Sequence, residues 1–245
     1  KAVTVSGITA KDKVYDGKTN ATLDCSKVTL DGILENDTLT VTATGTFESA
    51  NVGVRKVKIS GFKLGGASAN NYVLAESGNQ TETTATITAR KVTVTPDNQS
   101  KVYEEKDPDL TYAVSGVLDG ETLKGITLTR AEGENAGEYA ITATADTGAN
   151  PNYDVTFAEG KFTINPKSID GAKVVLGKGL TANGAEQTQT VEKVLLDGKE
   201  LPADSYTVTD NTATAPGKYK LTVTAKGNYT DFVEQTYAIA PAKAE

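Results

Sequence analysis

The chain has 245 residues, of which 38% are hydrophobic and 23% are charged, a balance typical of a folded protein. Its net charge of −7 disfavours nucleic acids and anionic lipid surfaces as partners, because both attract basic proteins. The sequence contains no histidine, the commonest general base and metal ligand, and its single cysteine excludes an internal disulfide. No apolar run approaches the roughly 20 residues that span a bilayer, so we expect no membrane insertion.

Short stretches of alternating polar and apolar residues predict strands with one buried face. They begin at residues 1–5 and recur at 91–95, 139–144 and 220–225. Gly- and Asn-containing turns separate such stretches about every ten residues, as at Asp31-Gly32. No helical pattern of 11 or more residues is present, so the sequence predicts an all-β protein with antiparallel strands.

Four landmarks occur three times in the same order, at intervals of about 80 residues. Each copy has a turn bounded by two leucines, a short turn that ends in Gly, an Asn-Tyr pair and a closing strand with Ile. The leucine turns are Leu34–Leu39, Leu118–Leu123 and Leu196–Leu201; the Gly turns are Asn51–Gly53, Asn135–Gly137 and Ala215–Gly217; the pairs are Asn71-Tyr72, Asn152-Tyr153 and Asn228-Tyr229; the isoleucines are Ile87, Ile164 and Ile239.

The repeats predict three small domains in series, at residues 1–89, 90–166 and 167–245. The first two share Lys-Val-Tyr at 13–15 and 101–103, while the third has no clear counterpart. No Gly/Ser-rich tether joins the domains, and Pro166 stiffens the second boundary, so we expect an elongated rod. An immunoglobulin-like sandwich is the favoured fold of each domain, and a helix-poor β-grasp sheet is the alternative.

The first domain, with Lys-Val-Tyr-Asp-Gly at 13–17, resembles the YDG-type repeat of bacterial surface proteins. The second resembles the MBG-type repeat through 101–103, 107–112, 116–123, 133–139 and Asn152-Tyr153. The third is similar to related surface modules through 205–208, 216–219 and 227–229. The resemblance implies an extracellular, cell-wall or cell-surface attached protein, with its signal and anchor outside this sequence. It implies no catalytic residues.

Acidic residues gather in two loops of the second domain, Glu104, Glu105, Asp107 and Asp109 in one and Glu132 and Glu134 in the other. Loop carboxylates can bind Ca²⁺, but the Asp-x-Asp-x-Asp-Gly pattern is missing, so we interpret them as solvated charges. Tyr15, Tyr72, Tyr103, Tyr153 and Tyr229 could form a platform for sugars; their repetition favours a packing role.

Two further residue types could carry chemistry. Cys25 lies in a strand-like run without a nearby His or an obvious basic partner, which indicates a buried, inert thiol. Lys91 and Asn165 have the chain order required for a Lys–Asn isopeptide bond, and they are the one covalent site that we predict.

The sequence therefore predicts a monomeric, non-catalytic spacer or stalk without a cofactor, a metal or a catalytic residue. The alternative is an adhesin module that binds carbohydrate or mucin, whose partners would be host or environmental glycans.

Overall fold

The computed structural model describes residues 1–242. Nearly all of their regular structure is β, and two single 3₁₀ turns at Ala69–Asn71 (η1) and Ala203–Ser205 (η2) interrupt it. The all-β prediction is confirmed. The described residues contain no helix that is long and apolar enough to cross a membrane.

Contacts divide the chain into two compact units. The first consists of Lys1–Thr95, Tyr112–Thr127 and Ala143–Ala158, and the second of Pro96–Thr111, Leu128–Thr142 and the chain from Glu159 onward. The units follow contacts rather than repeats, so the boundaries after Ala89 and Pro166 stay a prediction.

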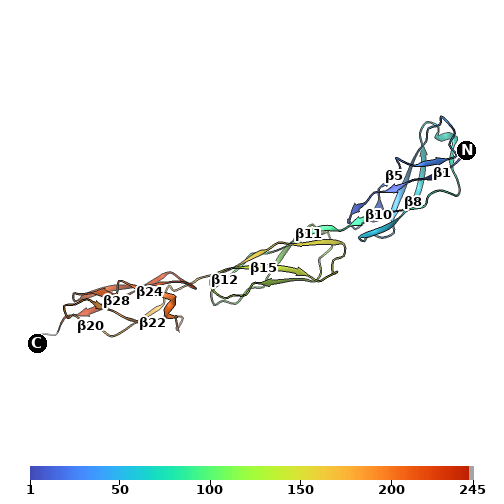
Figure 1. Cartoon of the computed structure of the whole chain (residues 1–245). Helices are drawn as coiled ribbons and strands as arrows, with labels where there is room; N and C mark the ends of the chain where they lie inside the picture. The colour runs from blue at the N-terminus through green and yellow to red at the C-terminus, as the bar shows by residue number, and fades with distance from the viewer. Residues whose placement is uncertain (243–245) are drawn as a thin grey trace. The chain divides into compact units, whose positions relative to one another are not determined.

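The first unit contains four sheets (Figure 1), with strand orders β6-β1-β9, β3-β10-β8-β7-β4, β2-β5 and β13-β11-β16. Its strands are β1 (Ala2–Ser6), β2 (Thr9–Ala10), β3 (Lys13–Val14), β4 (Asn20–Ala21), β5 (Leu23–Asp24), β6 (Thr29–Asp31), β7 (Thr40–Phe47), β8 (Gly53–Gly65), β9 (Val73–Leu74), β10 (Glu82–Thr88), β11 (Arg90–Pro96), β13 (Tyr112–Ser115) and β16 (Tyr153–Phe157).

A sandwich core lies between β1 and the large sheet of the first unit. Val5 of β1 and Ile8 pack with Val41 of β7 and Ile59 of β8, and all four are buried. The alternation in β1 and β8 places one face of each strand in this core. The predicted sandwich type of fold is thus confirmed.

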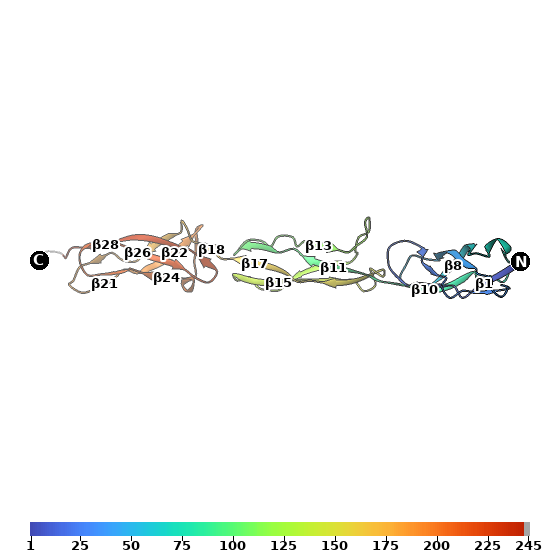
Figure 2. The same cartoon turned by 90° about the horizontal axis from the view of Figure 1, so that it is seen from above.

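The second unit contains five sheets (Figure 2), with strand orders β12-β17-β15-β14, β18-β27, β19-β22-β23, β20-β28-β26-β24 and β21-β25; β14 and β15 also contribute residues to the first unit. Its strands are β12 (Gln99–Val102), β14 (Ile126–Arg130), β15 (Gly137–Ala145), β17 (Gly160–Asn165), β18 (Lys167–Ser168), β19 (Lys173–Leu176), β20 (Leu180–Thr181), β21 (Gln187–Thr188), β22 (Val191–Leu196), β23 (Lys199–Glu200), β24 (Tyr206–Thr209), β25 (Thr212–Ala213), β26 (Gly217–Ala225), β27 (Tyr229–Thr230) and β28 (Phe232–Ala240).

Not every strand pair is antiparallel as expected. The opening strand of each repeat runs parallel to the strand that starts near the Asn-Tyr landmark: β1 with β9, β11 with β16 and β18 with β27. Strand alternation does not encode direction, and parallel pairing needs only a long connection, which each repeat supplies. This recurrent pairing brings the Asn-Tyr landmark to the start of each repeat.

Candidate functional site

The Asn-Tyr landmark and the leucine turn lock together in the first two repeats. The Tyr72 hydroxyl accepts a hydrogen bond from the Leu34 N–H at 2.9 Å and donates one to the Asp37 carboxylate at 2.5 Å. The hydrogen bond from Tyr72 lowers the pKa of Asp37. In the second repeat, the Tyr153 hydroxyl makes the same two bonds.

In the second repeat, the Tyr153 hydroxyl accepts a hydrogen bond from the Leu118 N–H at 3.2 Å and donates one to the Glu121 carboxylate at 2.7 Å. The acid stands three residues after the first leucine in both turns, which explains why that spacing recurs. In the third repeat Lys199 takes the place of the acid, and the turn becomes a hairpin in which Asp197 and Gly198 have φ of 50° and 80°.

The backbone between the first two repeats is held by contacts from both sides, at a place that we call the first junction (residues 88–90 and their partners). The Tyr15 N–H donates to the Thr88 carbonyl at 2.9 Å, and the Arg90 N–H donates to the Asn152 carbonyl at 3.0 Å. Backbone hydrogen bonds therefore fix the linker on both sides of the repeat boundary.

The side chain of Asn152 bridges the first junction. Its carbonyl oxygen accepts from the Val52 N–H at 3.1 Å, and its amide nitrogen donates to the Asn51 side chain at 3.0 Å. An amide has both a donor and an acceptor, so one asparagine can satisfy the exposed groups of the Asn-Val-Gly turn. The Gly-turn landmark is thus one half of the junction.

Tyrosine rings close the first junction. The rings of Tyr15 and Tyr153 pack edge to face with centroids 5.6 Å apart. The Tyr15 hydroxyl donates to the second oxygen of Glu121 at 2.8 Å, so one carboxylate accepts from both phenols. Leu118 and Tyr153 pack against the buried cluster around Phe47, and the hydrogen bond to Glu121 raises the pKa of Tyr15.

The second junction, at residues 165–167, repeats these backbone and asparagine contacts. The Tyr103 N–H donates to the Asn165 carbonyl at 2.8 Å, and the Lys167 N–H donates to the Asn228 carbonyl at 2.9 Å. The Asn228 side chain accepts from the Ala136 N–H at 2.7 Å and donates to Asn135 at 2.9 Å.

The second junction has a tyrosine pair of the same geometry, but the acid beside it comes from the preceding repeat and not from the leucine turn of the following one. Tyr103 and Tyr229 pack edge to face at 5.4 Å. Glu104, next to Tyr103, now contacts the Tyr229 hydroxyl at 3.5 Å and the Lys167 ammonium at 3.1 Å. Each junction thus has two sides. We call the side from the preceding repeat, made of Lys-Val-Tyr and Asn-x-Gly, the donor edge. We call the side from the following repeat, made of the Asn-Tyr pair and the leucine turn, the acceptor edge.

Comparisons with known families agree with this order of repeats. Residues 1–85 match the model of the YDG domain, and residues 92–163 match that of the MBG domain of the YGX type. We refer to the repeats that carry these two matches as the YDG domain and the MBG domain. The first junction lies between the two matched ranges, and both domain families indicate a surface-associated protein. No curated protein matches the chain.

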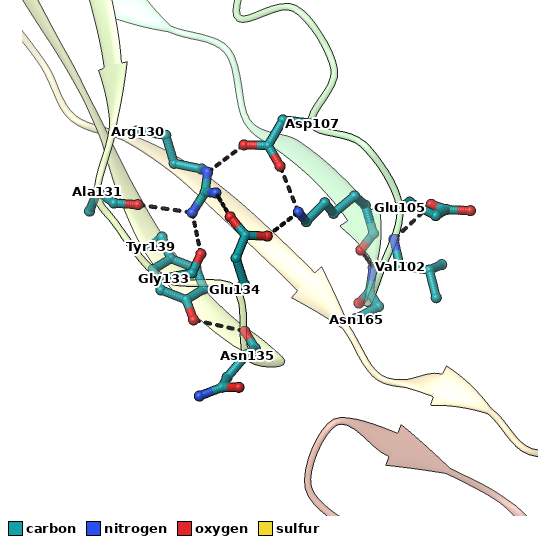
Figure 3. A network of polar contacts seen from close by, with 11 residues as sticks. Val102, Glu105, Asp107, Arg130, Ala131, Gly133, Glu134, Asn135, Tyr139 and Asn165 are labelled. Atoms are coloured by element: carbon teal, nitrogen blue, oxygen red, sulfur yellow. Dashed lines mark hydrogen bonds and ion pairs between the residues drawn. The ribbon is translucent and has the colours of Figure 1, made fainter. Parts of the chain in front are cut away.

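The MBG domain contains an ionic network on one side of its sheet (Figure 3). Lys101 of β12 forms ion pairs with Asp107 at 2.7 Å and Glu134 at 2.5 Å, and Arg130 of β14 forms ion pairs with the same two carboxylates at 2.7 and 2.6 Å. The Lys101 side chain is only 4% exposed. Hydrogen bonds from Lys101 lower the pKa of both carboxyls.

Arg130 ties this network to the core of the MBG domain. Its guanidinium lies 4.9 Å from the ring centre of Phe162 and 5.4 Å from that of Tyr139. It also donates to the Gly133 carbonyl at 2.6 Å, which fixes the loop that carries Glu134 (Figure 3). The network neutralises four charges among themselves.

The acidic residues singled out in the sequence have separate surroundings. Asp107 and Glu134 belong to the ionic network, Glu104 belongs to the second junction, and Glu105 accepts from the Val102 N–H at 2.9 Å. Asp109 and Glu132 are exposed. Within residues 1–242 no three His, Cys, Asp or Glu side chains gather in a way that could hold a metal ion.

Lys91 and Asn165 lie in different sheets of the MBG repeat. Lys91 is exposed on β11 opposite Asp154, and Asn165 ends β17, where its exposed side chain donates to the Lys101 carbonyl at 3.4 Å. An isopeptide bond between them stays a prediction, which a loss of one ammonia from the intact mass would test. Cys25 is half-buried beside β7, and burial raises the pKa of its thiol.

Sequence reasoning found the landmarks but missed that they contact one another across repeat boundaries. A difference between the repeats could have revealed these contacts. The third repeat lacks both Lys-Val-Tyr and the Asn of the Gly turn, so these two landmarks occur together or not at all. It also missed Lys101 and Arg130. Arg130 continues the apolar alternation of Ile126 and Leu128, which marks an inward-facing cation.

Proposed function

We propose that the chain is a non-catalytic structural spacer, a stalk segment of an extracellular, cell-wall or cell-surface attached bacterial protein. The observation that carries the proposal is the recurrence of one joint, with the same backbone, asparagine and tyrosine contacts, at both junctions. A joint that is rebuilt with different flanking residues indicates that a fixed connection between consecutive domains is what the repeats preserve.

The chemistry of the joint supports stiffness. Each junction removes the freedom of its linker through two backbone hydrogen bonds and fixes the rotation about it through a bridging asparagine and a tyrosine pair. A Gly/Ser linker would instead act as a flexible coil. If each domain is about as long as a ten-residue strand, three stiffly joined domains should reach roughly 100 Å.

Small-angle X-ray scattering of the intact chain tests the spacer function. We expect a thin rod with a maximum dimension of roughly 100 Å. The double variant Asn152→Ala/Asn228→Ala should show a broader distribution of conformations, whereas Asn71→Ala, the equivalent asparagine outside both junctions, should leave the curve unchanged. A natural chain that scatters like its double variant would contradict the proposal.

A second function has one observation in its favour. A shallow hollow beside β13 is lined by Val117 and the leucine turn and by Tyr112 and Val114, each 39% exposed. An exposed tyrosine beside such a hollow is a surface on which a sugar ring can stack, as a carbohydrate- or mucin-binding adhesin module requires. The five recurrent tyrosines lie in the turns and junctions instead.

A glycan and mucin array distinguishes the two functions. The spacer proposal predicts no saturable binding by the intact chain. Binding that is lost in Tyr112→Ala but kept in Tyr206→Ala, a change at a partly buried tyrosine that does not line this hollow, would establish the adhesin function and its site.

A further inference from the structure

The YDG domain carries a third acceptor edge, formed by Lys1, Leu34, Asp37, Asn71 and Tyr72. The Lys1 nitrogen donates to the Asn71 carbonyl at 2.7 Å, the bond that Arg90 makes to Asn152 and Lys167 makes to Asn228. Tyr72 caps the leucine turn as Tyr153 does. The acceptor half of the joint is therefore complete.

This third acceptor edge lacks the donor half that covers the other two. Leu34 is 53% exposed, while the equivalent Leu118 packs on the cluster around Phe47 and the equivalent Leu196 is 7% exposed in a cluster that includes Tyr103. The side-chain amide of Asn71 is exposed and makes no hydrogen bond within residues 1–242, where Asn152 and Asn228 each make two.

The acid at this edge selects the kind of donor that fits. Asp37 stands where Glu121 stands, and Glu121 accepts from Tyr15 of a YDG-type donor edge. Both donor edges have an acid after the tyrosine, but Asp16 of the YDG type pairs with Lys13 of its own edge at 2.7 Å. Glu104 of the MBG type instead reaches Tyr229 of its acceptor edge, whose leucine turn has Lys199 in place of the acid. Glu104 facing Asp37 would bring two carboxylates together, which is unfavourable.

We propose that the edge formed by Lys1, Leu34, Asp37, Asn71 and Tyr72 is a docking site for the donor edge of another YDG-type domain placed directly ahead of Lys1. In the docked state, the Asn71 side chain bonds the Asn-Val-Gly turn of the leading domain. The tyrosine of its Lys-Val-Tyr donates to Asp37 and packs edge to face on Tyr72, while Leu34 is covered.

A tandem protein tests the docking site, with residues 1–89 placed directly ahead of the full chain so that Lys1 follows Ala89 as Arg90 does. With Cys25→Ser in both copies, spin labels at Thr42→Cys of each copy report the distance between the two YDG domains. The reference is the natural chain with Cys25→Ser and labels at Thr42→Cys and Thr129→Cys, on either side of the first junction.

We expect a distance distribution within a factor of about two of the reference width, against one several-fold wider for a flexible connection. Asn71→Ala in the following copy should widen it. A control tandem, with residues 1–242 ahead of the full chain, places the third repeat before Lys1. That repeat has neither Lys-Val-Tyr nor the Asn of the Gly turn, so the distance distribution across its connection to Lys1 should be wide.

Two outcomes of the distance measurement would overturn the proposal. One is a distribution in the 1–89 tandem as wide as in the control tandem. The other is a narrow distribution that Asn71→Ala leaves unchanged. Ellipticity per residue equal to that of the natural chain is required of every fusion, and a leading copy that fails to fold beside Lys1 also counts against the site, since docking should stabilise it.

Discussion

At the scale of single residues, Phe162 is the side chain on which the MBG core depends most. It is fully buried, packs with Ile141 and Ile164, and carries the guanidinium of Arg130 on its ring. We expect Phe162→Ala to lower the free energy of unfolding by about 3–5 kcal/mol, because it leaves a cavity. Denaturant unfolding measures this loss. Phe157→Ala is the control and should cost far less, because Phe157 is 41% exposed.

The ionic network makes a pH-dependent contribution whose sign follows from Asp107. Lys101, and then Arg130, lower the pKa of this carboxyl in the folded state. Its contribution is therefore complete above the ordinary pKa near 4 and is lost as the pH falls through the lowered value. Since Asp107 is 38% exposed, solvent screening keeps the effect small.

The change Lys101→Met should flatten the loss of stability between about pH 5 and pH 2, because it removes the main cause of the lowered pKa. Denaturation midpoints across this range measure the slope. Lys161→Met, which breaks the exposed Lys161–Glu138 pair, is the matched control and should keep the natural slope. Equal slopes in the natural chain and Lys101→Met would show that the network is not the source.

Residue-level prediction from sequence was most successful where alternation alone decides burial. Val3, Val5, Val92 and Val94 are buried as their alternation predicts. The partners of Tyr15 and Asn152 could not be predicted, because each lies in another repeat about 100 or more residues away. Alternation encodes which face of a strand is buried, and it carries no information about such distant pairs.

At the scale of elements, Gly116 shows how closely two strands approach. It has φ of +91°, and a Cβ there would lie 2.6 Å from the Lys91 carbonyl oxygen; Gly32 stands in the same position against Ala2 in the YDG domain, at 2.8 Å. A side chain at Gly116 must therefore displace β11. The recurrence of this approach shows that the repeats preserve backbone packing as well as side chains.

We expect Gly116→Ala to destabilise the chain by clearly more than Gly120→Ala. Gly120 also has a positive φ, +82°, but no atom lies within 4 Å of its added Cβ, so this control carries only the conformational cost of about 1–2 kcal/mol. Thermal unfolding of the two variants measures the difference. Equal losses of stability in the two variants would mean that β11 can shift without an energetic cost.

The elements themselves were predictable to different degrees. The strands at 91–95, 139–144 and 220–225 are present as parts of β11, β15 and β26. The parallel pairs β1–β9 and β11–β16 were not predicted, because direction depends on the long connection and not on the strand sequence. Those parallel pairs set the acceptor edges, so the sites were harder to predict than the strands.

At the scale of the whole molecule, the two junctions should contribute separately to stability. Asn152 and Asn228 each make two side-chain hydrogen bonds, and they share no partner. At about 0.5–1.5 kcal/mol for each bond, Asn152→Ala and Asn228→Ala should each lose about 1–3 kcal/mol, and the double variant should lose their sum.

Scanning calorimetry measures how strongly each junction couples the unfolding of neighbouring domains. A domain held by its neighbour unfolds with it, whereas a released domain unfolds by itself. We expect the double variant to unfold in more separate steps than the natural chain, and Asn71→Ala to change the free energy by no more than about 0.5 kcal/mol. Asn71 has the same residue type and the same place in its repeat, so it differs only in lacking a donor edge. Equal losses at Asn71, Asn152 and Asn228 would assign the asparagine a role inside each domain; a loss confined to the last two would show that the landmark is preserved to connect domains.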